Sequence, residues 1–287
     1  MMTSKERINR ILDFQTPDRV GIKDLFWDET KTSWQKCLGK DVEDYFDFDI
    51  RVLDIEKRLT DRDLAEFFSD KNSNRFRAMS FREPFQHYVD KVGLEQALEN
   101  IGRMPEAVFS EFKKDLDKVL SKAIGVLDKG YKVDGLWLFG DLAYSQGLFF
   151  SPEFYEKHLF GFHKEVCYFF ASYGIPAILH SDGNISTIIP QLIKAGFRAL
   201  HPIQYSAGLD ITDLKREYKK DIVFFGNFDI DMVRFPRDIL KRSLIKRLDM
   251  CKEGGGYIFG LDGPLGPDVK VEDYQFIVET VKEHGRY

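Results

Sequence analysis

The stretch Pro176-Ala-Ile-Leu-His-Ser-Asp-Gly-Asn184 is the starting point for interpreting the whole chain. Its apolar run at 177–179 is short and is bounded by turn-forming residues, which indicates a buried strand. A polar tip follows at 180–184, and the amphipathic segment 185–195 predicts a helix that Asn184 caps. In α/β proteins such strand ends carry the chemistry, because the strand is rigid and the loop is open to ligands.

The same pattern of strand, polar tip and helix recurs along the chain. Strands are expected at 19–26, 49–55, 76–81, 133–140, 177–179, 197–203, 221–226 and 256–260. Helices are expected at 4–14, 29–38, 56–70, twice within 93–127, at 151–173 and 185–195, and from 271 onward. The alternation, without a low-complexity linker, predicts one domain (1–287) with a (β/α)₈ barrel fold. A doubly wound open sheet is the alternative, but no strand is followed by Gly-x-Gly-x-x-Gly.

Composition narrows the classes of partner and compartment. The 287 residues carry 42 Lys and Arg against 47 Asp and Glu, a net charge of -5 without a long basic run. This balance argues against a nucleic-acid partner. The three cysteines (Cys37, Cys167, Cys251) lie far apart, which favours a reducing cytoplasm over a disulfide framework. No apolar run approaches the ~20 residues that span a bilayer, so we expect a soluble protein without a membrane partner.

Polar residues follow each predicted strand, and a barrel would bring these strand ends to one face. In chain order they are Asp24 or Asp28, Asp54, Arg82 or Glu83, Asp141, Tyr144, His180, Asp182, Gln204, Asn227, Asp229 and Asp262. Each residue taken alone is explained as a loop residue or a helix cap, and Asp141 and Asp229 are well placed to cap the segments after them. Together they predict an acidic ring around a histidine, which is unusual for a scaffold.

Two kinds of chemistry suit such a ring. Crowded carboxylates raise one another's pKa, so that one of them stays protonated and acts as a general acid. Alternatively, His180 and Asp182 bind a metal ion together with Asp262, and the metal polarises a substrate oxygen. His-x-Asp is a weak motif by itself and no thiolate lies near it, so the residues leave both chemistries open.

The remaining histidines and the glycine run have simpler interpretations. His158 and His163 lie on a predicted helix and are expected at the surface or in packing contacts, and His201 is expected to be a buried barrel residue. Gly254-Gly-Gly256 precedes a strand and lacks a following Lys-Ser/Thr, so it predicts a turn rather than a phosphate loop.

Several motifs resemble the uroporphyrinogen decarboxylase superfamily, over most of the chain and most strongly from Val133 onward. They are Ser4-Lys-Glu-Arg-Ile-Asn-Arg-Ile-Leu12, Pro17-Asp-Arg-Val20, Gly140-Asp-Leu-Ala-Tyr144, Gly147-Leu-Phe-Phe-Ser-Pro-Glu153, His180-Ser-Asp-Gly-Asn184, and Gly255-Gly-Tyr-Ile-Phe259 with Pro267. The resemblance implies a (β/α)₈ barrel, in agreement with the strand count.

Two branches of the superfamily imply different reactions. The porphyrinogen decarboxylases work without a cofactor, and their Arg-Gln-x-Gly-Arg-Tyr motif is missing from this sequence. The other branch moves methyl groups to or from a corrinoid protein, with zinc activating a thiol or an ether oxygen. Its thiol-methylating members carry His-x-Cys and a later Cys; here Asp182 stands at the first Cys, and Asp262 falls near the later one. The His-Ser-Asp-Gly-Asn form looks more like enzymes that demethylate methoxylated substrates.

The resemblance therefore implies a corrinoid-dependent, zinc-assisted methyltransferase. Its zinc ligands would be His180 and Asp182, with Asp262 as a third, and Asp141 would act beside them in catalysis. Substrate contacts are expected from Asp54, Tyr144, Gln204, Asn227 and Asp229. A cofactor-independent decarboxylase is the alternative, for which Arg51, Arg77 and Arg82 are the cationic candidates. A non-catalytic, ligand-binding relative is a third, favoured if the short region around 59–76 leaves the mouth uncovered.

Overall fold

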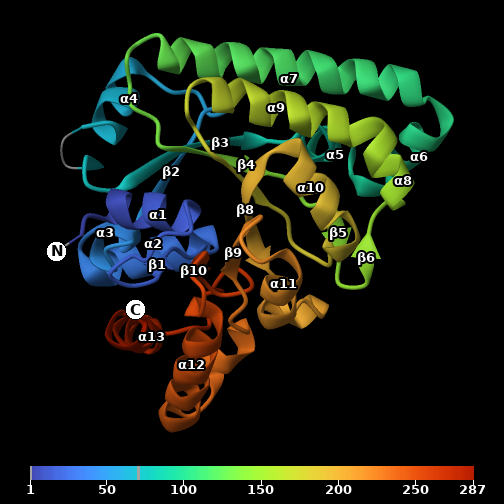
Figure 1. Ribbon diagram of the computed structural model, residues 1–287. Helices are drawn as coiled ribbons and strands as arrows, with labels where there is room; N and C mark the ends of the chain where they lie inside the picture. The colour runs from blue at the N-terminus through green and yellow to red at the C-terminus, as the bar shows by residue number, and fades with distance from the viewer. Residues whose placement is uncertain (1, 70–71) are drawn as a thin grey trace. The chain divides into compact units, whose positions relative to one another are not determined.

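The computed structural model describes residues 2–69 and 72–287, and it has the predicted (β/α)₈ fold of parallel strands alternating with helices (Figure 1). The chain divides into two compact units. The first comprises Met1–Arg51, Asn74–Phe76 and His201–Tyr287, and the second comprises Val52–Ser73 and Arg77–Leu200. That the whole chain forms a single domain stays a prediction. The predicted helix at 56–70 corresponds to α4 (Asp61–Phe67), and Asp70 itself lies outside the described residues.

The first unit contains one end of the barrel sheet, in the strand order β1-β10-β9-β8. Its strands are parallel where β1 pairs with β10 and where β10 pairs with β9. Its elements are α1 (Ser4–Leu12), β1 (Gly21–Ile22), α2 (Asp28–Leu38), α3 (Val42–Tyr45), η4 (Tyr205–Ala207), α11 (Ile211–Tyr218), β9 (Val223–Gly226), η5 (Ile230–Arg234), α12 (Arg237–Lys252), β10 (Tyr257–Phe259) and α13 (Val271–His284). A capping box opens α1, with Thr3 and Glu6 bonded reciprocally.

The second unit contains the order β8-β7-β4-β3-β2 and a small antiparallel hairpin, β5-β6. The boundaries between the units fall within strands β2 and β8, so each of these strands has residues in both units. Its elements are β2 (Ile50–Asp54), α4, β3 (Phe76–Arg82), α5 (Pro84–Val92), α6 (Leu94–Arg103), α7 (Pro105–Leu127), β4 (Gly135–Phe139), β5 (Ala143–Tyr144), β6 (Gly147–Leu148), α8 (Pro152–Phe154), η2 (Tyr155–Leu159), α9 (Phe160–Ser172), β7 (Ala177–His180), η3 (Ser186–Ile188), α10 (Ile189–Ala195) and β8 (Phe197–Ile203).

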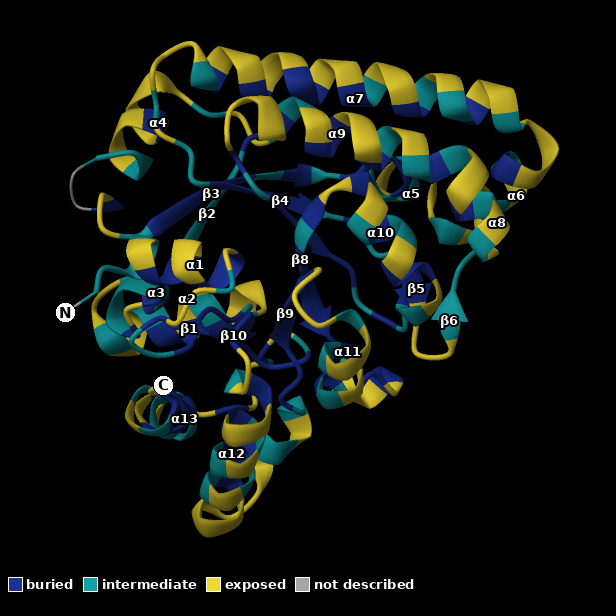
Figure 2. Ribbon diagram, viewed as in Figure 1, coloured by how far each residue is buried: buried dark blue, intermediate teal, exposed yellow. Residues whose placement is uncertain are grey.

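Burial explains why these segments form where they do. Strands β7, β9 and β10 are buried throughout and β4 and β8 almost throughout, whereas long outer helices such as α7 are buried along one stripe (Figure 2). Helix α7 shows the stripe clearly, because Val108, Phe112, Leu116 and Ala123 recur at helical spacing and are all buried. Phe112 meets Phe162 of α9 edge to face, with 5.9 Å between the ring centroids. Helices α7 and α9 therefore pack side by side (Figure 1).

Three differences from the predicted elements have local causes. Residues 84–92 form helix α5, which the sequence analysis missed; Glu83 caps it and Pro84 occupies its first turn. The predicted helix at 151–173 contains one π-helical turn, η2. The predicted helix at 185–195 begins only at Ile189, as α10. The Asn184 side chain accepts the N–H of Ser186, the first residue of the 3₁₀ turn η3, at 3.1 Å, so the prediction that Asn184 caps the helix is wrong.

Of the described helices, none combines the length and the apolar character that crossing a lipid bilayer requires.

Asp24, directly after β1, is a buried carboxyl group of the first unit. It accepts the Leu261 N–H at 2.6 Å and the Tyr274 hydroxyl at 2.5 Å. Burial raises the pKa of Asp24 from 3.8 to about 7, although both hydrogen bonds lower it. The folded state therefore favours the protonated acid, and ionising it costs free energy of folding.

We expect Asp24 to make the protein less stable as the pH rises from 4 to 7, because over this range only the unfolded state loses the Asp24 proton. Each pKa unit corresponds to about 1.4 kcal/mol. Asp24→Asn keeps both hydrogen-bonding partners without the charge, so its stability relative to the native chain should increase between pH 5 and pH 8. Urea denaturation at the two pH values measures this, and an equal difference at both would contradict it.

Candidate functional site

The tips of β4 and β7 are joined by hydrogen bonds that continue the sheet beyond its last strand pair. The two strands are parallel neighbours, and Phe139 lies opposite His180 in their register. Four further bonds follow: Gly140 N–H to His180 O (2.9 Å), Leu142 N–H to Ser181 Oγ (3.0 Å), Asp182 N–H to Asp141 Oδ1 (3.0 Å) and Asn184 N–H to Tyr144 O (2.9 Å). Strand, tip and following loop are thus fixed as one piece.

Gly183 allows the two loops to approach this closely. Its φ of +84° lies in the region that glycine adopts without strain. A Cβ atom at this position would lie 2.5 Å from the carbonyl carbon of Ala143 and 2.7 Å from the nitrogen of Tyr144. Both distances are far below van der Waals contact, so only glycine fits here.

The joined tips bring three possible metal-ligating side chains together: Asp141, His180 and Asp182. One donor atom from each lies within 4.8 Å of the other two. His180 Nε2 is 3.7 Å from Asp141 Oδ1. His180 is buried, whereas the two aspartates are partly exposed. One imidazole and two carboxylates form a donor set that zinc and other borderline or hard cations accept.

The environment keeps the histidine uncharged. Burial lowers the pKa of His180 to about 3, so the imidazole is neutral at physiological pH and able to bind a metal or accept a hydrogen bond from a ligand. Its ring stacks on Phe139, with 4.4 Å between centroids and 11° between planes. Burial raises the pKa of Asp141, and the nearby carboxylates Glu83 and Asp90 raise it further. A bound cation would offset this repulsion between carboxylates.

Comparison with known proteins places the chain in a family. The family described as uroporphyrinogen decarboxylase (URO-D) matches residues 92–284, which include the whole cluster. The chain belongs to the URO-D family. Among solved structures, the chain is similar to a methyltransferase from Methanosarcina mazei, with a TM-score of 0.75, 13% identity and coverage of 99% of each chain.

A second solved structure is more distant. The endo-beta-mannanase/endo-beta-glucanase of Prevotella bryantii matches with a TM-score of 0.50 and 8% identity, over 99% of this chain and 50% of the other. At such identities the two likenesses concern the fold alone. No curated protein sequence matches the chain.

Asp262, the predicted third zinc ligand, lies in the first unit of this URO-D family chain. Its two carboxylate oxygens accept the backbone N–H groups of Ser206, at 3.0 Å, and Ile230, at 2.9 Å. These bonds tie the loops after β8 and β9 to the end of β10. Asp141 completes the cluster of three around His180, and metal binding by Asp262 stays a prediction.

The other predicted substrate residues of the first unit are Gln204, Asn227 and Asp229. Gln204 is half-buried at the start of η4. Asn227 is buried with a φ of +70°, and its amide donates to the carbonyls of Ile203 and Leu209, which is a structural role. Asp229 caps η5, as its alternative interpretation predicted, and also lines a cavity of about 350 Å³ beside Tyr205.

In the second unit, Asp54 and Tyr144 are the predicted substrate residues. Asp54 ends β2 and accepts the Glu56 N–H at 2.9 Å. Tyr144 is about half exposed and stacks on Phe149, with 5.8 Å between centroids. The Tyr144 carbonyl accepts the Asn184 N–H of the joined tips, and Tyr144 follows Asp141 by three residues in the sequence. Two site residues were not predicted from the sequence: Ser181 and Gln86, whose side chains accept the backbone N–H groups of Leu142 and Asp141.

The three arginines considered for a decarboxylase are all engaged with protein carboxylates. Arg51 contacts Asp41 at 2.7 Å, and Arg77 lies 3.6 Å from Asp134. Arg82 forms ion pairs with Glu56 and Asp90. Each of these contacts reduces the capacity of the guanidinium group to bind a substrate carboxylate.

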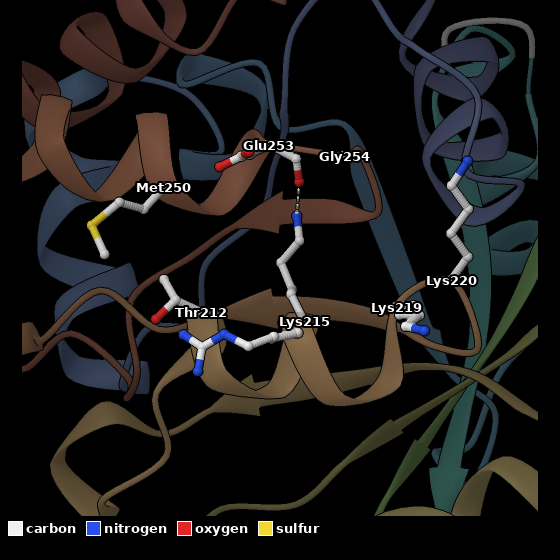
Figure 3. Close-up of a pocket in the computed structure, with 8 residues that line it drawn as sticks. Thr212, Lys215, Lys219, Lys220, Met250, Glu253 and Gly254 are labelled. Atoms are coloured by element: carbon white, nitrogen blue, oxygen red, sulfur yellow. Dashed lines mark hydrogen bonds between the residues drawn. The ribbon is translucent and has the colours of Figure 1, made fainter.

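A group of lysines beside a cavity of the first unit has a structural explanation. Lys215, Lys219 and Lys220 line a hollow of about 570 Å³, and Figure 3 shows Lys215 reaching toward the backbone at Glu253. Lys215 Nζ donates to the carbonyls of Cys251, Glu253 and Gly255, which lie at and after the end of α12. Cations favour helix C-termini. The three glycines 254–256 all have positive φ, so the predicted turn is confirmed.

The joined tips make Gly183 sensitive to substitution. Gly183→Ala should lower the free energy of unfolding by more than about 2 kcal/mol, because left-handed strain of about 1–2 kcal/mol adds to the clash with Ala143. Gly208→Ala is the matched control, since Gly208 has a φ of +82° with open space around its Cβ position. Chemical denaturation compares the two variants. Equal destabilisation would show that the tips tolerate a side chain.

Proposed function

We propose that this URO-D family protein is an enzyme that moves a methyl group between a small substrate and a corrinoid protein, with zinc assistance. The observation that carries the proposal is the cluster of Asp141, His180 and Asp182 at the ends of two adjacent strands. The similarity of the chain's fold to that of a methyltransferase also supports methyl transfer. The reducing cytoplasm is the proposed compartment, supported by three cysteines that are all free.

The donor set fits zinc by its chemistry. Catalytic zinc sites use three protein ligands and keep one position open for a substrate or water. A buried, neutral imidazole and two carboxylates supply three such ligands. When bound, zinc would act as a Lewis acid on an oxygen or sulfur atom of the substrate.

The protein residues have separable tasks in this proposal. His180 and Asp182 would hold the zinc, with Asp141 as the third ligand of the cluster; Asp262 is the alternative third ligand. The exposed ring of Tyr144, stacked on Phe149, would lie against a planar substrate such as a methoxylated aromatic compound. In the transfer, the substrate oxygen keeps the electron pair of the broken bond and takes up a proton, while the methyl acceptor supplies the pair for the new bond.

The decarboxylase alternative has weaker support. A polycarboxylate substrate needs cationic partners, and the arginines considered for this role are engaged with Asp41, Asp134, Glu56 and Asp90. Methyl transfer from an uncharged ether places no such demand on the site. A non-catalytic relative would bind a ligand without turnover, and the substrate test below separates it.

Zinc binding is the first expected outcome. Protein purified without chelator should contain about one zinc per chain, and His180→Ala should lose it, because two carboxylates alone form an incomplete ligand set. His158→Ala is the matched control, since His158 lies on the π-helical turn η2 and stacks on Phe109. Metal analysis by inductively coupled plasma mass spectrometry decides the point. Zinc retained by His180→Ala would remove the metal-based mechanism.

Substrate class is the second expected outcome. Methoxylated aromatic compounds should bind in calorimetric titrations and lose their methyl group when a reduced corrinoid is supplied as acceptor. Porphyrinogen should be neither bound nor decarboxylated. Turnover of the porphyrinogen alone would favour the decarboxylase, and binding of methoxylated compounds without demethylation would favour a non-catalytic relative.

A further inference from the structure

We propose that Gln86 is a positioning residue for Asp141, and that the buried pair Glu83 and His163 fixes the helix end that carries it. None of the three belongs to the Asp141–His180–Asp182 cluster. The inference deepens the proposed function and rests on it only for its metal-binding readout.

Gln86 contacts the cluster through the backbone of Asp141. Its side-chain oxygen accepts the Asp141 N–H at 3.0 Å. Its side-chain nitrogen donates to Asp90 Oδ1, one helical turn further along α5, at 2.7 Å. The amide is therefore held at both ends, and its orientation follows from these two bonds. Asp141 in turn accepts the Asp182 N–H, so Gln86 acts on the strand tip that positions both aspartates.

Glu83 fixes the first turn of α5, on which Gln86 lies. It follows β3 directly, and its backbone N–H donates to Phe139 O at 2.8 Å. Its carboxylate accepts the N–H groups of Phe85, at 3.0 Å, and Gln86. Glu83 is therefore the N-cap of α5. Its side chain is fully buried, although capping a helix does not require burial.

His163 of α9 lies beside the buried Glu83 carboxylate, although its Nε2 atom forms no hydrogen bond there. His163 Nε2 lies 3.4 Å from Glu83 Oε2, with both side chains fully buried. His163 Nδ1 is 2.9 Å from the hydroxyl of Tyr155, at the start of the π-helical turn η2. Buried polar groups are costly unless they are paired, and π-helical turns are frequent at functional sites. The polar residues from Tyr155 to Glu83 thus end beside Gly140, the residue that precedes Asp141.

The packing around Gly140 shows how closely Glu83 lies behind Asp141. A Cβ atom at Gly140 would fall 1.9 Å from Glu83 Cγ. The Gly140 N–H meanwhile donates to His180 O at 2.9 Å. The residue before Asp141 is therefore held between the Glu83 side chain and β7, and Asp141 itself is held by Gln86. Small movements of α5 would displace the Asp141 carboxylate relative to His180.

The experiment compares Gln86→Met, which removes the acceptor oxygen at nearly constant length, with the native protein. Amide hydrogen exchange of Asp141, measured by NMR without metal, should accelerate at least about tenfold because the N–H loses its acceptor. Zinc affinity, measured by competition with a chromophoric chelator, should fall by about 10- to 100-fold, as for other residues that orient metal ligands. Gln86→Glu keeps the acceptor oxygen but loses the donation to Asp90 Oδ1, so its exchange should be slower than that of Gln86→Met and no slower than that of the native protein.

Gln96→Met is the matched control. Gln96 lies exposed on α6 and donates to Asn100 one turn along, without contact to the cluster. It should change neither exchange at Asp141 nor zinc affinity. Unchanged exchange in Gln86→Met overturns the inference. If the native protein binds no zinc, the proposed function fails, and the exchange comparison still decides whether Gln86 positions Asp141.

Discussion

The backbone hydrogen bonds between the tips of β4 and β7 are the constraint on which the candidate site depends. The Gly140 N–H to His180 O bond extends the sheet by one residue, and the bond from Asp182 N–H to Asp141 closes the loop beyond it. Each hydrogen bond contributes about 1 kcal/mol to stability, but together the bonds hold the three side chains of the cluster in a single arrangement. A side chain on Gly183 is incompatible with that arrangement.

Burial then sets the chemistry of the arrangement. The His180 imidazole lies against Phe139, away from water, and stays neutral well below physiological pH. Asp141 beside it is raised in pKa by its own burial and by neighbouring carboxylates. A neutral nitrogen donor next to two carboxylates in a partly dry setting favours a cation, whose charge compensates the acids. The same setting would strengthen the polarisation of a substrate oxygen.

Local patterns predicted the fold because they are short-range signals. The alternating strands and helices, the Thr3 capping box and the tip at His180 can all be recognised within a dozen residues. The contacts that complete the site are not local. Ser181 Oγ accepts the Leu142 N–H, and Gln86 accepts the Asp141 N–H across 55 positions of sequence, from a helix that was not predicted. Asp262 was expected to be a metal ligand from the family resemblance. In the structure its carboxylate accepts backbone N–H groups from two loops.

The central claim is that Asp141, His180 and Asp182 form one metal-binding cluster. Crystals grown with zinc and measured on both sides of the zinc absorption edge test it most directly. We predict an anomalous peak about 2.0–2.2 Å from a ring nitrogen of His180 and from a carboxylate oxygen of each aspartate. A peak at other residues, or no peak at this cluster in zinc-saturated crystals, would contradict the account.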